Sequence, residues 1–189
     1  MDRALLDQAR EALQNASRIL VLSHIRPDGD AVGSLLGLGL SLQAAGKQVQ
    51  MVLADGLPSV FRRLEGSDQV RSKPEGEFDL IVVVDSSDLN RIGSALDGYP
   101  LPDLNIDHHP TNLEFARVNL VDPQAVATAE MLAEHLPGLR LPIDRQVAGA
   151  LLFGIIADTI GFRTYNMTPK ALRLAAELME AGADLPDLY

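Results

Sequence analysis

The segment Ile19-Leu-Val-Leu-Ser-His-Ile-Arg-Pro-Asp-Gly-Asp30 joins an apolar run to a polar turn. Its first four residues are apolar, which is typical of a buried strand. Residues 31–45 follow as an almost wholly apolar helix pattern that ends at Gly46. A strand and a buried helix in this order predict an α/β protein, and open α/β sheets bind ligands where their strands end. We therefore expect the functional site at this polar turn.

Periodicity along the rest of the chain extends the α/β pattern. Apolar runs predict three more strands, at residues 49–54, 80–84 and 104–106. Apolar residues at helical spacing predict further helices at residues 2–16, 125–136, 144–158 and 169–181. Residues 65–77 form the most loop-like stretch. We therefore expect an α/β fold with a mainly parallel, doubly wound sheet flanked by helices, and a more helical second half.

The size and composition indicate one globular, cytoplasmic domain. The chain has 189 residues and a net charge of −10, which argues against a basic face for long nucleic acids. It has no cysteine, so disulfides, cysteine-ligated metals and thiol catalysis are excluded. No apolar stretch is long enough to cross a bilayer, and the first 20 residues lack the pattern of a signal peptide. We expect no membrane partner.

Gly33, Gly37 and Gly39 lie inside the predicted helix at residues 31–45. They do not form a phosphate-binding P-loop, because no Gly-Lys-Ser or Gly-Lys-Thr follows them. Close helix packing is therefore their expected role.

Acidic and imidazole side chains gather at the polar turn. His24, Asp28 and Asp30 lie within seven residues, and a proline and a glycine between them bend the backbone. Asp28 or Asp30 alone would be explained by capping of the helix that follows. Two acids and a histidine exceed what a cap needs, so this stretch predicts metal ligation.

Three later positions repeat this chemistry. Asp85 closes the apolar run at residues 80–84, where it is either a functional acid or a turn residue. Asp107-His108-His109 follows the next predicted strand, and two structural histidines in a turn are the alternative. Asp158 ends a helix pattern, where the helix dipole disfavours a negative charge and a cation would compensate it.

The predicted ligands are four carboxylates and two imidazoles: His24, Asp28, Asp30, Asp85, His108 and Asp158. Such a set without sulfur suits Mn²⁺ or Mg²⁺ and also accommodates Co²⁺, Zn²⁺ or Fe²⁺. Six ligands with four negative charges are too many for one ion, but they suit two ions about 3.5–4 Å apart that share a carboxylate. Two divalent ions would reduce the net charge from −10 to −6, which favours an anionic substrate.

The four stretches resemble the motifs of the DHH phosphoesterase superfamily: H-x-x-P-D-x-D-x-x-G-S, an acid after a buried strand, D-H-H, and G-x-x-x-D-T. They occur in the family's order and span residues 23–164. The variants P-D-G-D-A-x-G-S and D-T-x-G-F-R are most similar to the branch of bifunctional oligoribonucleases and pAp phosphatases. That branch degrades very short RNA (nanoRNA) and removes the 3′-phosphate of pAp. The exonuclease RecJ and the family II pyrophosphatases share the motifs more distantly.

The resemblance implies an enzyme with a dinuclear, usually manganese, centre. By motif position, one ion is assigned to His24 and Asp28, and Asp85 bridges to the second ion. The ligands of that second ion are Asp30, His108 and Asp158.

The resemblance also implies roles around the centre. His109 would act beside the scissile phosphate as an acid or electrostatic partner, and Asp85 is counted with it among the catalytic residues. Asp107 would orient a ligating histidine. Arg163 is a candidate contact to a substrate phosphate, with a surface role as the alternative.

We therefore expect residues 1–189 to form the catalytic domain of a metal-dependent phosphodiesterase or phosphatase. Its expected substrates are short oligoribonucleotides or nucleoside 3′,5′-bisphosphates, and it is a possible homodimer. The family's smaller C-terminal domain, with a Gly-Gly-Gly-His motif that grips substrate, is not in this sequence, so weak activity is expected. The alternatives are a pyrophosphatase or cyclic-dinucleotide phosphodiesterase, and a non-catalytic nucleotide-binding domain.

Overall fold

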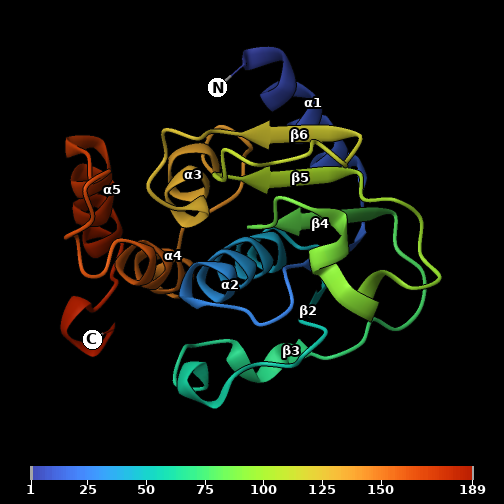
Figure 1. Cartoon of the computed structure of the whole chain (residues 1–189), viewed down its shortest axis with the longest axis horizontal. Coiled ribbons are helices and arrows are strands. Elements are labelled where there is room, and N and C mark those ends of the chain that lie inside the picture. Colours follow the sequence, from blue (N-terminus) through green and yellow to red (C-terminus); the bar gives the residue numbers. More distant parts are fainter. Residues whose placement is uncertain (1, 189) are drawn as a thin grey trace.

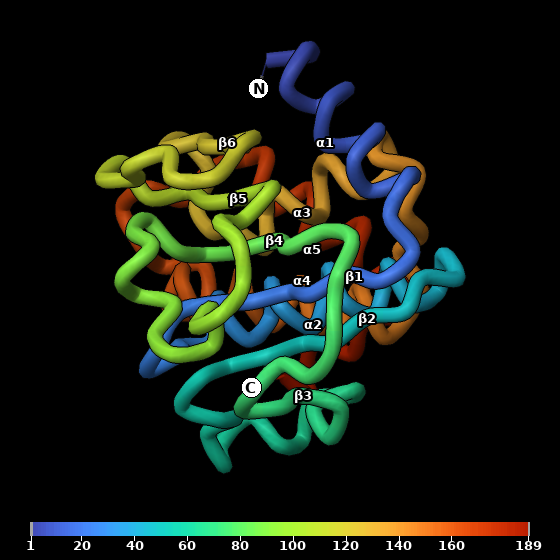
Figure 2. The backbone as a smooth tube through the Cα atoms, turned by 90° about the vertical axis from the view of Figure 1, so that its right-hand side faces the viewer, coloured from blue at the N-terminus to red at the C-terminus, as the bar shows by residue number. Residues whose placement is uncertain are grey.

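Six parallel strands form one sheet in residues 2–188, the part of the chain that the computed structural model describes. The strands are β1 (Arg18–Leu22), β2 (Gln48–Val52), β3 (Val70–Arg71), β4 (Leu80–Val84), β5 (Leu104–Asp107) and β6 (Val118–Val121). Their order in the sheet is β3-β2-β1-β4-β5-β6, and every pairing is parallel. The chain order reverses between β1 and β4, which is where ligands bind in such sheets. Figure 2 shows the central strands side by side.

The α-helices gather on one face of this sheet (Figure 1). They are α1 (Arg3–Asn15), α2 (Gly29–Ala44), α3 (Thr128–His135), α4 (Arg145–Asp158) and α5 (Pro169–Glu180). Alternate residues of β1 face opposite sides, so Ile19 and Val21 join the core beneath these helices, whereas Leu20 and Leu22 pack on the other side. That other face is covered by the 3₁₀ segment η3 (Leu89–Leu96) and neighbouring loops. The α/β prediction is confirmed.

Glycines bring α2 and α4 into close contact. A Cβ atom at Gly33 would lie 2.7 Å from the Ala150 carbonyl oxygen and 2.7 Å from the Gly154 nitrogen. A Cβ at Gly37 would meet the Leu151 side chain, and one at Gly39 would meet Met51 of β2. The packing role predicted for these glycines is confirmed. This contact sets the first turn of α2 beside the C-terminal half of α4.

Two strands and several short helices differ from the sequence-based prediction. Residues 65–77 contain η2 (Ser67–Gln69) and the two-residue strand β3, although no element was expected there. The edge strand β6 was also missed, because its four residues alternate between buried and half-buried positions. Helix α3 begins at Thr128 instead of residue 125. The remaining 3₁₀ segments are η1 (Ser59–Phe61) and η4 (Leu185–Leu188). No helix in the described residues is both long enough and apolar enough to cross a bilayer.

Candidate metal centre

The predicted ligands meet at the carboxyl edge of the sheet. His24 follows β1, Asp85 follows β4 and His108 follows β5. Asp28 and Asp30 lie at the start of α2, and Asp158 is the last residue of α4. We call these six residues the carboxylate–imidazole cluster. Its potential ligand atoms form two groups, each with all atoms within 4.8 Å of one another: His24, Asp28 and Asp85, and Asp30, His108 and Asp158.

In the first group, His24 presents a nitrogen that lacks a hydrogen-bond partner. The His24 Nδ1 lies 2.8 Å from the Ile25 carbonyl oxygen, so Nδ1 carries the proton in the neutral ring and Nε2 keeps its lone pair. Nε2 is buried and has no hydrogen-bond partner among the described residues. It lies 3.6 Å from Asp85 Oδ2 and 3.8 Å from Asp28 Oδ2. Three acceptor atoms that face one another fit a shared cation.

Asp28 combines this position with the helix-capping role that was the alternative. Its Oδ1 accepts a hydrogen bond from the Ala31 backbone N–H at 3.0 Å, so Asp28 is the N-cap of α2. Its Oδ2 is the oxygen that faces His24. Capping therefore fixes the carboxylate and leaves the second oxygen free for a cation.

The second group repeats this arrangement around His108. The His108 Nδ1 lies 3.3 Å from the Ala125 carbonyl oxygen, which directs Nε2 toward the carboxylates. Nε2 lies 3.9 Å from Asp30 Oδ2 and 3.8 Å from Asp158 Oδ2. These distances are too long for direct hydrogen bonds. They leave room for a cation between the imidazole and the two carboxylates.

Asp85 connects the two groups. Its Oδ2 faces His24 at 3.6 Å, and its Oδ1 lies 3.8 Å from His108 Nε2. The backbone N–H of Asp85 donates to the Ile106 carbonyl at 2.9 Å, which anchors this residue to β5. Asp85 has a φ of +55°, an unusual conformation for a residue other than glycine, and such strain is often found at functional sites. One oxygen toward each group is the geometry that a bridging carboxylate needs.

Burial and charge shift the pKa values in this cluster. Burial, with Asp85 and Asp158 nearby, raises the pKa of Asp30 well above its ordinary value. Burial would also raise the pKa of Asp85, but the surrounding histidines lower it overall. Burial lowers the pKa of His24, but the Asp85 carboxylate and the Ile25 carbonyl raise it more. Crowded carboxylates such as these resist full ionisation unless a cation neutralises part of their charge.

His109 is held differently from His108. Its Nδ1 donates to Asp107 Oδ1 at 2.7 Å, and Asp107 is fully buried. This hydrogen bond raises the pKa of His109 despite its partial burial. Asn112 Nδ2 in turn donates to Asp107 Oδ2 at 2.6 Å. Asp107 was expected to orient a ligating histidine, but its partner is His109, the histidine expected to face the phosphate.

Two arginines, Arg163 and Arg91, differ in their relation to the cluster. Arg163 is exposed, and its Nε donates to the Ile160 carbonyl at 2.6 Å. Within residues 2–188, Arg163 forms no hydrogen bond or ion pair with a cluster residue. Arg91, which the sequence analysis did not single out, is half-buried, and its carbonyl accepts from the Ile25 N–H at 2.7 Å. Its charge acts on both His24 and His109.

Two other residues were missed, Thr128 and Asn112. Both side chains are neutral. Thr128 contacts Asp30 and Asp85, which are distant in the sequence, and Asn112 contacts Asp107 of β5. Only the spacing of Asn112 after the Asp-His-His motif could have drawn attention to it. Thr128 had no signal in the sequence, because its partners Asp30 and Asp85 are 98 and 43 residues away.

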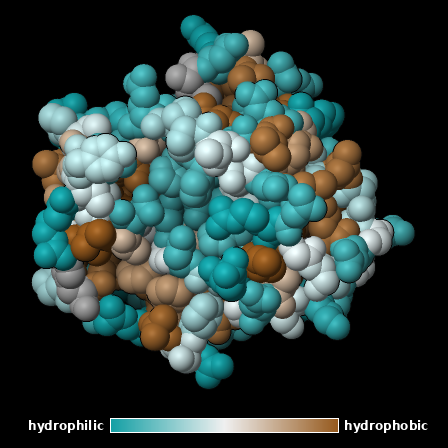
Figure 3. All heavy atoms as spheres, viewed as in Figure 1, coloured by the Kyte–Doolittle hydropathy of each residue, from teal (hydrophilic) through white to brown (hydrophobic). Residues whose placement is uncertain are grey.

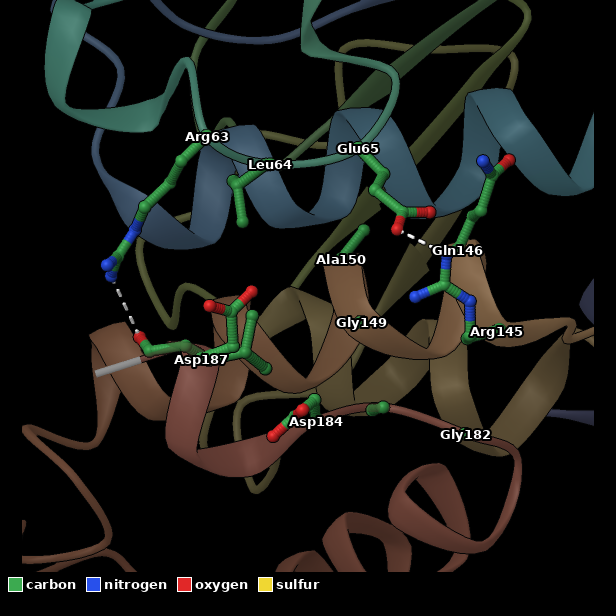
Figure 4. Close-up of a pocket in the computed structure, with 12 residues that line it drawn as sticks. Arg63, Leu64, Glu65, Arg145, Gln146, Gly149, Ala150, Gly182, Asp184 and Asp187 are labelled. Atoms are coloured by element: carbon green, nitrogen blue, oxygen red, sulfur yellow. Dashed lines mark hydrogen bonds and ion pairs between the residues drawn. The ribbon is translucent and has the colours of Figure 1, made fainter.

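A separate pocket lies between the loop before η2, helix α4 and the residues after α5 (Figure 4). Arg63 donates to the Leu188 carbonyl there at 3.3 Å, and Arg145 pairs with Glu65. None of the cluster residues lines this pocket. On the face seen in Figure 3, hydrophilic and apolar residues are intermixed. This pocket is therefore separate from the carboxylate–imidazole cluster at the carboxyl edge of the sheet.

Fold and site together define an α/β protein with a carboxylate-rich group of potential ligands at the switch point of a parallel sheet. The chain matches the DHH family, N-terminal domain, over residues 18–155, and it belongs to this family.

Similar proteins support this assignment. The bifunctional oligoribonuclease and PAP phosphatase NrnA of Thermus thermophilus is 40% identical over 176 residues, which cover 90% of this chain and 52% of that protein. NrnA of Bacillus subtilis is 30% identical over 175 residues, which cover 90% and 55%. The crystal structure of an exopolyphosphatase-related protein from Bacteroides fragilis matches with a TM-score of 0.91 and 25% identity, over 100% of this chain and 59% of that one. The chain spans about half the length of these curated relatives.

Proposed function

We propose that this chain is the catalytic part of a metal-dependent phosphoesterase that hydrolyses short oligoribonucleotides and nucleoside 3′,5′-bisphosphates such as pAp. The observation that carries the proposal is the pair of ligand groups joined by Asp85, with the unpartnered His24 Nε2 in one of them. The names of the Thermus and Bacillus relatives support the two substrate classes.

The donor set fits two divalent cations. His24, Asp28 and Asp85 would hold one, and the second would be held by Asp30, His108 and Asp158 together with the other oxygen of Asp85. Oxygen-rich sites with two imidazoles suit Mn²⁺, with Mg²⁺, Co²⁺ and Zn²⁺ as alternatives. When bound, two such ions supply Lewis-acid polarisation of a phosphate.

His109 would supply the proton that the leaving oxygen needs. Its Nδ1 is engaged with Asp107, so Nε2 is the atom free to face a substrate. The Asp107 hydrogen bond raises the pKa of His109, so the ring holds its proton to higher pH than a free imidazole does. A cationic His109 also stabilises negative charge on the phosphate.

Two arginines are candidates to bind the remaining phosphate charge. Arg163, which the sequence made a candidate phosphate contact, stands five residues after Asp158 on an exposed turn. Arg91 is half-buried beside His24 and forms no ion pair within the described residues. A guanidinium near a phosphate site binds its oxygens through two parallel hydrogen bonds.

The test uses the whole chain, first stripped of metal and then supplied with Mn²⁺. A chromogenic phosphodiester reports the chemistry without base recognition, and pAp, a dinucleotide, a cyclic dinucleotide, pyrophosphate and a long RNA report the substrate class. We expect Mn²⁺-dependent hydrolysis of the diester, pAp and the dinucleotide. Asp158→Asn should lose it, whereas Asp68→Asn, an exposed aspartate in η2, should retain it.

Other outcomes would change the assignment. Hydrolysis of pyrophosphate or of the cyclic dinucleotide alone would replace the proposed substrate class with one of these. Mn²⁺ binding without hydrolysis of any of these compounds would favour a non-catalytic nucleotide-binding role. Equal activity of Asp158→Asn and the unmodified chain would contradict the proposed site.

A further inference from the structure

Thr128 contacts one carboxylate from each ligand group. It is the first residue of α3 and is fully buried. Its backbone N–H donates to Asp30 Oδ2 at 2.6 Å, and its Oγ1 donates to Asp85 Oδ1 at 2.9 Å. The Ala129 N–H adds a bond to Asp30 Oδ1 at 3.0 Å. The start of α3 therefore holds two carboxylates of the cluster, although it supplies no ligand.

The backbone and the side chain of Thr128 bind different aspartates, so a substitution can remove one hydrogen bond and keep the other. The bond to Asp30 comes from the backbone, so any residue except proline keeps it. The bond to Asp85 comes from the hydroxyl, so it depends on the side chain. Within residues 2–188, Thr128 is the only residue whose side chain donates a hydrogen bond of ordinary length to the Asp85 carboxylate.

The hydroxyl holds one oxygen of the Asp85 carboxylate through a hydrogen bond of 2.9 Å. With Oδ1 bound to Thr128 and near His108, Oδ2 must point toward His24. If this bond were absent, the carboxylate plane could turn, and its two oxygens would no longer face the two groups together. Groups that orient ligands in this way commonly change metal affinity about 10–100-fold when they are removed.

We propose that Thr128 is a positioning residue for divalent-cation binding, because its hydroxyl sets the Asp85 carboxylate in the bridging orientation. This inference rests on the metal site of the proposed function. It assigns Thr128 no contact with an ion or a substrate.

The experiment titrates Mn²⁺ into the metal-free whole chain by calorimetry. Thr128→Val keeps the shape and the backbone N–H but removes the hydroxyl, and Thr128→Ser keeps the hydroxyl. We expect Thr128→Val to bind at least one Mn²⁺ about 10–100-fold more weakly than the unmodified chain. The Mn²⁺ affinity of Thr128→Ser should stay within about 3-fold of that of the unmodified chain. Rescue by the serine hydroxyl separates the positioning role from a merely structural one.

Ser41→Ala is the matched control for the loss of a buried hydroxyl. Ser41 is fully buried in α2, and its Oγ donates to the Pro142 carbonyl and to none of the cluster carboxylates. We expect this variant to bind Mn²⁺ as the unmodified chain does. Thermal unfolding in EDTA checks that each variant folds, and Thr128→Ala replaces the valine variant if that protein does not fold.

The outcomes separate this inference from the proposed function. Absence of Mn²⁺ binding to the unmodified chain would contradict the metal site itself. Two bound ions in the unmodified chain, with the same affinities in Thr128→Val or Thr128→Ala, would overturn only the role of Thr128. Equal weakening in the serine and valine variants would also overturn it, because the hydroxyl would then not be responsible.

Discussion

Replacing Asp158 with asparagine is predicted to change stability in opposite directions with and without metal. Asp158 is the last residue of α4, where the helix dipole disfavours a negative charge. Burial raises its pKa, and the nearby Asp85 raises it further although His108 opposes this. An amide keeps the shape and removes the charge. The metal-free protein should therefore gain stability from the change.

The magnitude follows from the spacing of the carboxylates. The ligand oxygens of Asp30 and Asp158 lie within 4.8 Å of each other. Two unit charges at this distance repel by about 3.5 kcal/mol at an effective dielectric constant of about 20. The raised pKa of Asp30 and the 33% exposure of the Asp158 side chain reduce this repulsion. We therefore expect a gain of about 1 kcal/mol, or about 2–4 °C in Tm for a chain of this size.

In the presence of Mn²⁺ the sign should reverse. Loss of Asp158 removes a ligand of the second ion, and one site filled at about 100 times its Kd stabilises the folded state by about 2.7 kcal/mol. After the gain of about 1 kcal/mol is subtracted, the variant should melt about 3–7 °C below the unmodified protein.

The assay is thermal unfolding at pH 7, in EDTA and in excess Mn²⁺. Asp68→Asn makes the same change of charge at an exposed aspartate, and it should show no reversal of sign. The reasoning is refuted if Asp158→Asn melts below the unmodified protein in EDTA. It is equally refuted if Mn²⁺ raises the Tm of both proteins by the same amount.

Three further predictions concern packing, proton transfer and pH. Gly33→Ala should lower stability by about 1–3 kcal/mol in chemical denaturation, because the new Cβ would meet backbone atoms of α4; Gly149→Ala, where a Cβ meets nothing within 4 Å, should be neutral or stabilising. His109→Ala should keep both Mn²⁺ ions by metal analysis and lose turnover about 10²–10⁴-fold; loss of an ion would show that His109 is a ligand. The metal-free protein should melt at a lower temperature at pH 8 than at pH 5.5. The raised pKa values of Asp30 and His24 mean that the folded state binds more protons than the unfolded state, so this stability is lost as pH rises; a higher Tm at pH 8 in EDTA would contradict this.

Much of the architecture is predictable from short patterns in the chain. The apolar runs that became β1 and β4 are buried along nearly their whole length, and each leads into polar residues at the edge of the sheet. Strand β6 is different, because it lies at the sheet edge and only half of its residues are buried. A short edge strand carries a weak hydrophobic signal. Strand β3 has two residues and carries none.

The site divides in a similar way. The residue types of the cluster, aspartate and histidine, indicate metal binding by themselves, so the cluster could be predicted from the sequence without its geometry. The partner of Asp107 could not, because adjacent histidines in a turn differ only in the direction that the backbone gives them. The role of Thr128 could not be predicted for another reason. Its two contacts depend on the packing of α3 against the start of α2 and the end of β4.

The central claim is that one carboxylate, Asp85, joins two cation sites at the carboxyl edge of the sheet. Anomalous diffraction at the manganese edge, from crystals of the whole chain grown with Mn²⁺, tests it most directly. The account predicts two peaks about 3.5–4 Å apart, one beside His24 and one beside His108, with an Asp85 oxygen bound to each. A single peak, or two peaks that Asp85 does not contact, would contradict it.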